Sequence, residues 1–173
     1  MQSIILGGGC FWCTESVFQS VKGVQSVVSG YMGGEATTAN YRAVCGGNSG
    51  HIEVVKVDFE ESIVPLDVIL DVFFATHDPT TKDRQGNDVG SQYRSVVFYT
   101  DEAQKPTIDH TINKLRDMGI NIVTEVHPAV EFYNAEEEHQ DFFNRNPSQA
   151  YCNFVIPPKL AKLRKEFSKY MVS

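Results

Sequence analysis

The chain has 173 residues, 42% of them hydrophobic and 21% charged, which fits a soluble globular domain large enough to bury a core. Its net charge of −7 argues against nucleic acid as the main partner, because a phosphate-binding surface needs an excess of basic residues. No apolar run approaches the length of a membrane span, and the first residues lack the pattern of a signal peptide. We expect a cytoplasmic monomer without a membrane partner.

Apolar periodicity predicts strands and helices in mixed order along the chain. A strand is predicted over 3–8, and apolar residues at helical spacing predict a helix over 10–21. The other strands are predicted over 25–31, 51–59, 94–99 and 120–126, and the other helices over 65–76, 101–118, 135–143 and 158–171. Because strict βαβ alternation is lacking, we predict an α+β fold. It would be a single-domain two-layer sandwich over 1–173, in which helices pack around a mixed sheet with a ferredoxin-like core.

The segment between the first strand and the first helix carries the strongest chemical signal. Three glycines at positions 7–9 precede Cys10, and two large aromatic residues, Phe11 and Trp12, follow it. A cysteine in the first turn of a helix is expected to have a lowered pKa, because the free N–H groups and the helix dipole favour the thiolate. Since the thiolate is the nucleophilic form, we predict that Cys10 performs chemistry rather than packing.

Cys13 lies three residues after Cys10 and permits three interpretations. The C-x-x-C pair is typical of a redox dithiol, as in thioredoxin-like proteins. It could also form half of a zinc site, although no second closely spaced pair of ligands completes it. The third interpretation is a small apolar residue facing the core, and the pattern does not separate it from the redox role.

Glu53 stands among Ile and Val residues in the strand predicted over 51–59. If its side chain points inward, desolvation would raise its pKa and keep it protonated, so that it could donate a hydrogen bond. The alternation also permits Glu53 to face solvent, opposite Ile52 and Val54. Taken alone, the pattern favours the solvent-facing interpretation.

Polar residues in or beside loops are weaker candidates. The long polar loop over 78–92 is expected to be functional. The hydroxyls of Tyr41 and Tyr93 could position a polar substrate atom, although half-buried packing is the commoner role of such tyrosines. Asp88 could be an ordinary turn residue. His139 follows three glutamates and is expected on a solvated helix face.

Several long segments resemble the A-type peptide-methionine sulfoxide reductases, which are specific for the S epimer of the sulfoxide. The family signature is found here as Gly9-Cys10-Phe11-Trp12, and other family segments are found as 41–53, 77–81, 84–95 and 135–140. The resemblance spans almost the whole chain. Two departures are Cys13, where the family commonly has glycine, and Cys152, which stands alone where some members carry two C-terminal cysteines.

The resemblance implies how a substrate would bind. Phe11 and Trp12 would form an apolar slot for the S-methyl group of methionine sulfoxide, which could be free or part of an oxidised protein. A neutral Glu53, with the hydroxyls of Tyr41 and Tyr93, would donate hydrogen bonds to the sulfoxide oxygen. Such donors stabilise the negative charge that develops on oxygen in the transition state.

The resemblance also implies the course of the reaction. Cys10 would attack the sulfur and become a sulfenic acid, while Asp88 would orient the neighbouring polar groups. A second cysteine would then form a disulfide with Cys10, and thioredoxin would reduce it. No metal or organic cofactor is implied. The competing hypothesis is a thioredoxin-like disulfide exchanger that uses Cys10 and Cys13 and needs none of the hydrogen-bond donors.

Two cysteines compete for the resolving role, and we predict Cys152 rather than Cys13. Cys152 lies between Pro147 and Pro157 in a segment with the composition of a loop, so it could reach the active site by local movement. The family resemblance also places a recycling cysteine in this context. Cys13 is close in sequence but would be held rigidly in the same helical turn. Cys45 is expected to be a packing residue.

Overall fold

A six-stranded mixed sheet forms the centre of the computed structural model, which describes residues 1–172. The strands lie in the order β7-β6-β1-β3-β2-β8, with β6 and β7 parallel and the other neighbouring pairs antiparallel. Their bounds are β1 (Gln2–Gly7), β2 (Val24–Met32), β3 (Ile52–Phe59), β6 (Val96–Tyr99), β7 (Glu125–Pro128) and β8 (Phe132–Asn134). This mixed sheet confirms the predicted α+β class.

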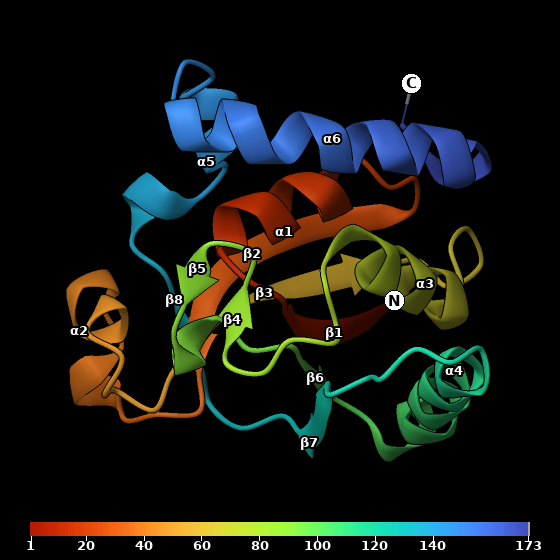
Figure 1. The fold of residues 1–173 in the computed structure, drawn as a ribbon, viewed down its shortest axis with the longest axis horizontal. Coiled ribbons are helices and arrows are strands. Elements are labelled where there is room, and N and C mark those ends of the chain that lie inside the picture. The colour runs from red at the N-terminus through yellow and green to blue at the C-terminus, as the bar shows by residue number, and fades with distance from the viewer. Residues whose placement is uncertain (173) are drawn as a thin grey trace.

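Six α-helices surround the sheet in the part of the chain that the structure describes. They are α1 (Phe11–Gln19), α2 (Tyr41–Cys45), α3 (Leu66–Thr76), α4 (Lys105–Asp117), α5 (Phe142–Arg145) and α6 (Ala150–Glu166). Figure 1 shows α1 against the sheet and α6 lying over α1. Among residues 1–172, no helix combines the length and the apolar character that a membrane span requires.

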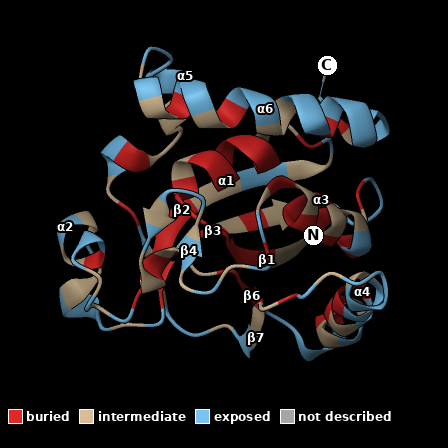
Figure 2. Cartoon of the chain, in the orientation of Figure 1, coloured by how far each residue is buried: buried red, intermediate tan, exposed pale blue. Residues whose placement is uncertain are grey.

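The main hydrophobic core fills the space between the sheet and helices α1, α3, α4 and α6. A smaller apolar cluster lies on the opposite face of the sheet. In β3, Val55 and Val57 join the main core, whereas Ile52 and Val54 join the smaller cluster. Both faces of this central strand are therefore buried, and Figure 2 shows the burial concentrated in the sheet and in α1.

The C-terminal helix differs most from its prediction. It was expected over 158–171, but α6 spans Ala150–Glu166 and contains Pro157 and Pro158. A proline removes a helical hydrogen bond, so the prolines suggested a helix start. The helix continues through them because its earlier residues, Cys152 and Ile156, are buried against the first helix and its flanking segment.

Other differences concern short elements. The strand expected over 120–126 is β7, at Glu125–Pro128, and the helix expected over 135–143 is a 3-10 turn at Glu137–His139 followed by α5. The loop over 78–92 contains a small hairpin of β4 (Arg84–Gln85) and β5 (Asp88–Val89). Neither α2 nor β8 was predicted, because elements of five and three residues are too short to show a period.

Candidate active site

A tight turn delivers Cys10 from the end of β1 to the start of α1. Gly9 has a φ of 95°, and a Cβ atom at this position would lie 2.7 Å from the Gln85 side chain. Glycine is required there because other residues rarely adopt this conformation and would collide with the hairpin loop. Cys10 directly precedes α1, and its carbonyl accepts the N–H groups of Cys13 and Thr14 at 3.1 and 3.4 Å.

The predicted lowering of the Cys10 pKa is wrong. The side chain is 8% exposed, and burial raises its pKa well above the usual thiol value, with Cys13 and Glu53 acting in the same direction. The hydrogen bond from Cys10 instead lowers the pKa of Cys13. Desolvation thus outweighs the helix N-terminus at Cys10, whereas the hydrogen bond between the two thiols favours the charged form of Cys13.

Three of the four cysteines meet in one apolar cluster. Cys10, Cys13 and Cys152 pack together with Ile156, and all three are free thiols. The prediction that Cys152 lies in a loop is wrong, since it belongs to α6 and has no exposed surface. Burial raises the pKa of Cys152 to about 11. Cys45 is exposed at the end of the short surface helix α2, so it is not the packing residue that was expected.

Glu53 is buried and points toward α1. It lies on the same face of β3 as Val55, and only 1% of it is exposed, so the solvent-facing interpretation is wrong. Its Oε1 accepts the backbone N–H of Phe11 at 3.1 Å, whereas its buried Oε2 has no hydrogen-bond partner within residues 1–172. Burial raises the pKa of Glu53 to about 8, so the carboxyl is largely protonated at neutral pH.

Aromatic rings surround the first turn of α1. Tyr41 lies nearly parallel to Phe11 and Trp12, with ring centroids at 6.3 and 6.1 Å. Trp12 stacks on Phe142 at 3.8 Å, and its indole N–H donates to Nδ1 of His139 at 3.2 Å. Phe11 has no exposed surface, so it lies beneath the half-buried Trp12 rather than beside it at the surface.

His139 is buried, which contradicts its expected place on a solvated helix face. The run of charged residues suggested solvation, but the segment forms a 3-10 turn whose neighbouring Glu136 also points inward. Glu136 accepts the backbone N–H of Tyr41 at 2.9 Å and the hydroxyl of Tyr31 at 2.8 Å. These bonds fix the start of α2 and hence the Tyr41 ring.

Both candidate tyrosines remain hydroxyl donors. Burial raises the pKa values of Tyr41 and Tyr93 above the usual phenol range, and the nearby Glu53 and Cys10 charges act in the same direction. Tyr41 lies beside Phe11, and the Ser91–Tyr93 segment packs against β3, the strand that carries Glu53.

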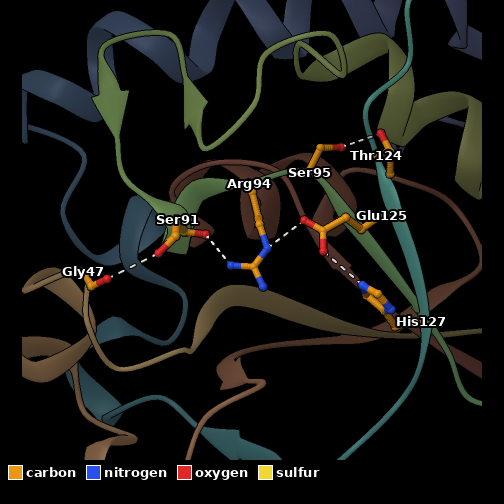
Figure 3. Close-up of polar contacts among 7 residues, drawn as sticks. All are labelled: Gly47, Ser91, Arg94, Ser95, Thr124, Glu125 and His127. Carbon is orange, nitrogen blue, oxygen red and sulfur yellow. Dashed lines mark hydrogen bonds and ion pairs between the residues drawn. The ribbon is translucent and has the colours of Figure 1, made fainter.

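A chain of polar contacts, drawn in Figure 3, fixes the short 3-10 helix η2 (Ser91–Tyr93). This helix carries Tyr93. The Arg94 guanidinium donates to the carbonyl of Ser91 at 3.0 Å and pairs with Glu125 of β7 at 2.8 Å. The Ser91 hydroxyl donates to the carbonyl of Gly47 at 3.4 Å. The helix is thereby tied both to the sheet edge and to the loop that follows α2.

Asp88 lies on a different side of Cys10. It accepts a hydrogen bond from the hydroxyl of Tyr151 on α6, and both residues line a pocket of about 400 Å³ with Cys10 and Cys13. The pocket is also lined by Gly8, Gln85, Gly86, Asn87, Phe154, Val155, Pro158 and Lys159. None of the residues predicted for the methyl slot or the oxygen site lines it. Cys10 therefore stands between two sets of predicted residues that the sequence did not separate.

Comparisons with known proteins decide the family. The model of the family described as "Peptide methionine sulfoxide reductase" matches residues 2–171. The chain belongs to this family. It is 87% identical over 173 residues to "Peptide methionine sulfoxide reductase MsrA" of Psychrobacter cryohalolentis, covering 100% of each chain. It is 55% identical over 171 residues to the protein of that name from Acinetobacter baumannii, covering 99% of each. The chain is therefore an A-type methionine sulfoxide reductase, as the sequence motifs predicted.

Solved structures support the same fold. The reduced form of Mxr1 from Saccharomyces cerevisiae is 33% identical with a TM-score of 0.78, covering 86% of this chain and 87% of that one. Methionine sulfoxide reductase A of Corynebacterium diphtheriae is 34% identical with a TM-score of 0.75, covering 86% of this chain and 76% of that one. These similarities confirm the predicted fold class.

The sequence did not predict two residues, Tyr151 and His139, that contact the candidate site from distant segments. Tyr151 reaches Asp88 from α6, and His139 reaches Trp12 from the segment before α5. The available signals were the position of Tyr151 beside Cys152 and that of His139 within a family segment. Neither signal indicates which partner the side chain contacts.

Proposed function

We propose that the chain reduces the S epimer of methionine sulfoxide, free or within oxidised proteins, by direct attack of Cys10. The observation that carries this proposal is the Glu53 carboxyl. One of its oxygens is anchored by the N–H of Phe11, and its buried Oε2 lacks a partner among the described residues. A carboxyl with a pKa near 8 is mainly protonated at neutral pH, so Glu53 can donate a hydrogen bond to the sulfoxide oxygen.

The chemistry depends on these neighbours. The Cys10 sulfur attacks the sulfoxide sulfur, the S–O bond breaks, and the oxygen passes to Cys10 as a sulfenic acid while methionine leaves. Glu53 gives its proton to the oxygen as negative charge develops there, and its carboxylate then accepts the thiol proton of Cys10. The hydroxyls of Tyr41 and Tyr93 add two further donors, which lower the barrier because they bind the oxygen most strongly in the transition state.

The methyl group of the substrate would lie on the aromatic surface formed by Trp12 and Tyr41. Phe11 supports this surface from below, since it is fully buried in the core. Trp12 is held in place by its stacking on Phe142 and its hydrogen bond to His139. Burial of a methyl group against a fixed apolar surface makes the binding free energy more favourable by about 1 kcal/mol.

The cysteine cluster supports a relay rather than a single resolving cysteine. Cys13 is hydrogen bonded to Cys10 and has the lowered pKa, so its thiolate would attack the sulfenic acid first, forming the Cys10–Cys13 disulfide and releasing water. Cys152, which packs against the pair, would then attack the Cys13 sulfur, forming Cys13–Cys152 and restoring the Cys10 thiol. This order gives both predicted resolving cysteines a role.

Thioredoxin is the proposed reductant, because a protein disulfide is most directly reduced by a protein dithiol. Mxr1, the yeast protein similar to this chain, has also been solved in complex with Trx2. The reduction would restore the cysteines for another cycle.

Mapping the disulfides after one turnover tests this sequence of steps. One equivalent of methionine S-sulfoxide is added to the reduced protein, the reaction is quenched with acid at increasing times, and linked peptides are identified without reductant. We expect Cys10–Cys13 early and Cys13–Cys152 late. A Cys10–Cys152 link with no earlier Cys10–Cys13 species would contradict the relay. Disulfide reduction of a model protein without sulfoxide turnover would instead favour the disulfide exchanger.

A further inference from the structure

The inner face of α6 is apolar except for one charged residue, Lys159. Cys152, Ile156, Leu160 and Leu163 lie at helical spacing on this face and are buried or half-buried. Lys159 lies among them and is also half-buried. A lysine in such a position loses hydration, and burial lowers its pKa accordingly. The charge therefore requires an interaction that offsets this cost.

Carboxylates do not provide that interaction. Among residues 1–172, no carboxylate lies within ion-pair distance of the Lys159 ammonium. Its Nζ donates to the carbonyl of Thr76, the last residue of α3, where the helix dipole is negative. Asp88 lines the same pocket but accepts the Tyr151 hydroxyl instead. The Lys159 ammonium is therefore held near the pocket by a backbone carbonyl and not by an ion pair with a carboxylate.

Cys13 is an ionisable group that shares two cavities with Lys159. Lys159 and Cys13 line the 400 Å³ pocket together, and they also line a smaller cavity with Gly8, Thr14, Val17, Phe73, Thr76 and His77. Their charges attract, since the ammonium lowers the pKa of Cys13 and the thiolate raises that of Lys159. The two residues come from α1 and α6, which only the fold brings together.

We propose that Lys159 is the counter-ion of the Cys13 thiolate and positions that thiolate for attack on oxidised Cys10. The first half concerns the resting enzyme, and the second half rests on the proposed function of Cys13. The reaction assisted is the attack of the thiolate on the Cys10 sulfenic acid, in which the S–S bond forms and hydroxide leaves as water with a proton from solvent. Lys159 acts through Cys13 and is a positioning residue.

Other charged groups also face Cys13, and the test must separate them. The Cys10 thiol lowers the pKa of Cys13 by hydrogen bonding, whereas Asp88 and Glu53 raise it. Cys152 faces it from α6. We therefore choose a background with Cys10, Cys45 and Cys152 replaced by serine, which leaves Cys13 as the sole thiol and keeps a hydroxyl donor at position 10.

Titration of the Cys13 thiolate by its ultraviolet absorbance tests the ion pair. Lys159→Met keeps the apolar stem and removes the charge, so we expect the Cys13 pKa to rise by about one pH unit, roughly a tenfold loss of thiolate near neutral pH. Lys159→Arg should largely restore the wild-type value. Lys165→Met, at an exposed lysine further along α6, is the matched control and should leave the Cys13 pKa unchanged. An unchanged Cys13 pKa in Lys159→Met would overturn the proposal.

The rate of disulfide formation tests the second half in the enzyme with all its cysteines. After one equivalent of sulfoxide, Lys159→Met should form the Cys10–Cys13 link about tenfold more slowly near neutral pH than wild type, with the difference vanishing at high pH. Methionine released in the same reaction is the internal reference for the first step. If the pKa rises but this rate is unchanged, the ion pair is supported and the role of Lys159 in positioning Cys13 for attack is overturned. If Lys159→Arg forms the link as slowly as Lys159→Met, the positive charge at position 159 is not what assists the attack.

Discussion

The Glu53 carboxyl combines burial, one anchored oxygen and one free oxygen, and this combination determines how the enzyme should respond to pH. Its pKa of about 8 lies above the ordinary value of 4.5. The folded state therefore binds this proton more tightly than the unfolded chain does. The contribution of Glu53 to the free energy of unfolding is greatest below the unfolded pKa and falls as pH rises through about 8.

The first prediction concerns the alkaline limb of the reaction. Because only the protonated Glu53 donates, single-turnover methionine formation should decline above an apparent pKa near 8. Glu53→Gln cannot lose a proton, so its rate should lack that decline. Quenched-flow measurements across pH would check this. An alkaline decline that persists in the glutamine variant would show that another group causes it.

The second prediction compares two replacements at the same position. Glu53→Gln keeps a hydrogen-bond donor at the oxygen site, whereas Glu53→Ala removes it. The alanine variant should lose about 10²-fold or more in single-turnover rate, and the glutamine variant should retain much more of it. Equally mild effects of both replacements would remove Glu53 from the chemistry.

At the scale of elements, the proposed relay requires the first turns of α6 to move. Pro157 and Pro158 cannot donate to the carbonyls of Asn153 and Phe154, so the helix is missing two hydrogen bonds there. The segment that carries Cys152 can therefore unwind at lower cost than an uninterrupted helix, which would let its thiol reach Cys13.

The third prediction tests that movement through Cys152→Ser. The variant should still release methionine in a single turnover, because Cys10 and Cys13 remain. Its thioredoxin-driven turnover should collapse, because the disulfide stays buried beneath α6. Cys45→Ser, at an exposed cysteine, is the control and should keep full turnover. Undiminished turnover by Cys152→Ser would mean that thioredoxin reduces the Cys10–Cys13 bond directly.

The fourth prediction concerns the contact between α1 and α5. Trp12→Ala should raise the KM for methionine sulfoxide, because the apolar surface for the methyl group is lost. It should also lower the Tm, since Trp12 stacks on Phe142 and bonds His139. Phe142→Ala removes the stacking partner alone and reports the effect of packing. If both variants change KM equally, the methyl group does not rest on Trp12.

For the whole molecule, the sequence predicts the central strands and the turn before Cys10 better than the surroundings of Cys10. Alternation in β3 and the glycines before Cys10 are local patterns, so they locate a strand and a turn. The pattern around Glu53 favoured a solvent-facing side chain, which is wrong because distant segments cover both faces of β3. The Cys10 pKa was misjudged for the same reason, since burial under α6 outweighs the local helix N-terminus.

The surroundings of Cys152 were also mispredicted, because they depend on the packing of distant segments. Two prolines suggested a loop around Cys152, and only tertiary packing against α1 keeps that segment helical. Family motifs located Tyr41 and Tyr93, but not the contacts that hold them. Features set by neighbouring residues were therefore predictable, whereas features set by the packing of α6 on the rest of the chain were not.

The central claim, oxygen transfer from substrate to Cys10, is tested most directly in a variant whose other three cysteines are replaced by serine. One equivalent of methionine S-sulfoxide is added, methionine is quantified, and the protein is trapped with a sulfenic-acid reagent before mass analysis. We predict one methionine per chain and one trapped sulfenic acid, located on Cys10. Methionine formed without a modified Cys10, or no methionine at all from the reduced protein, would contradict the account.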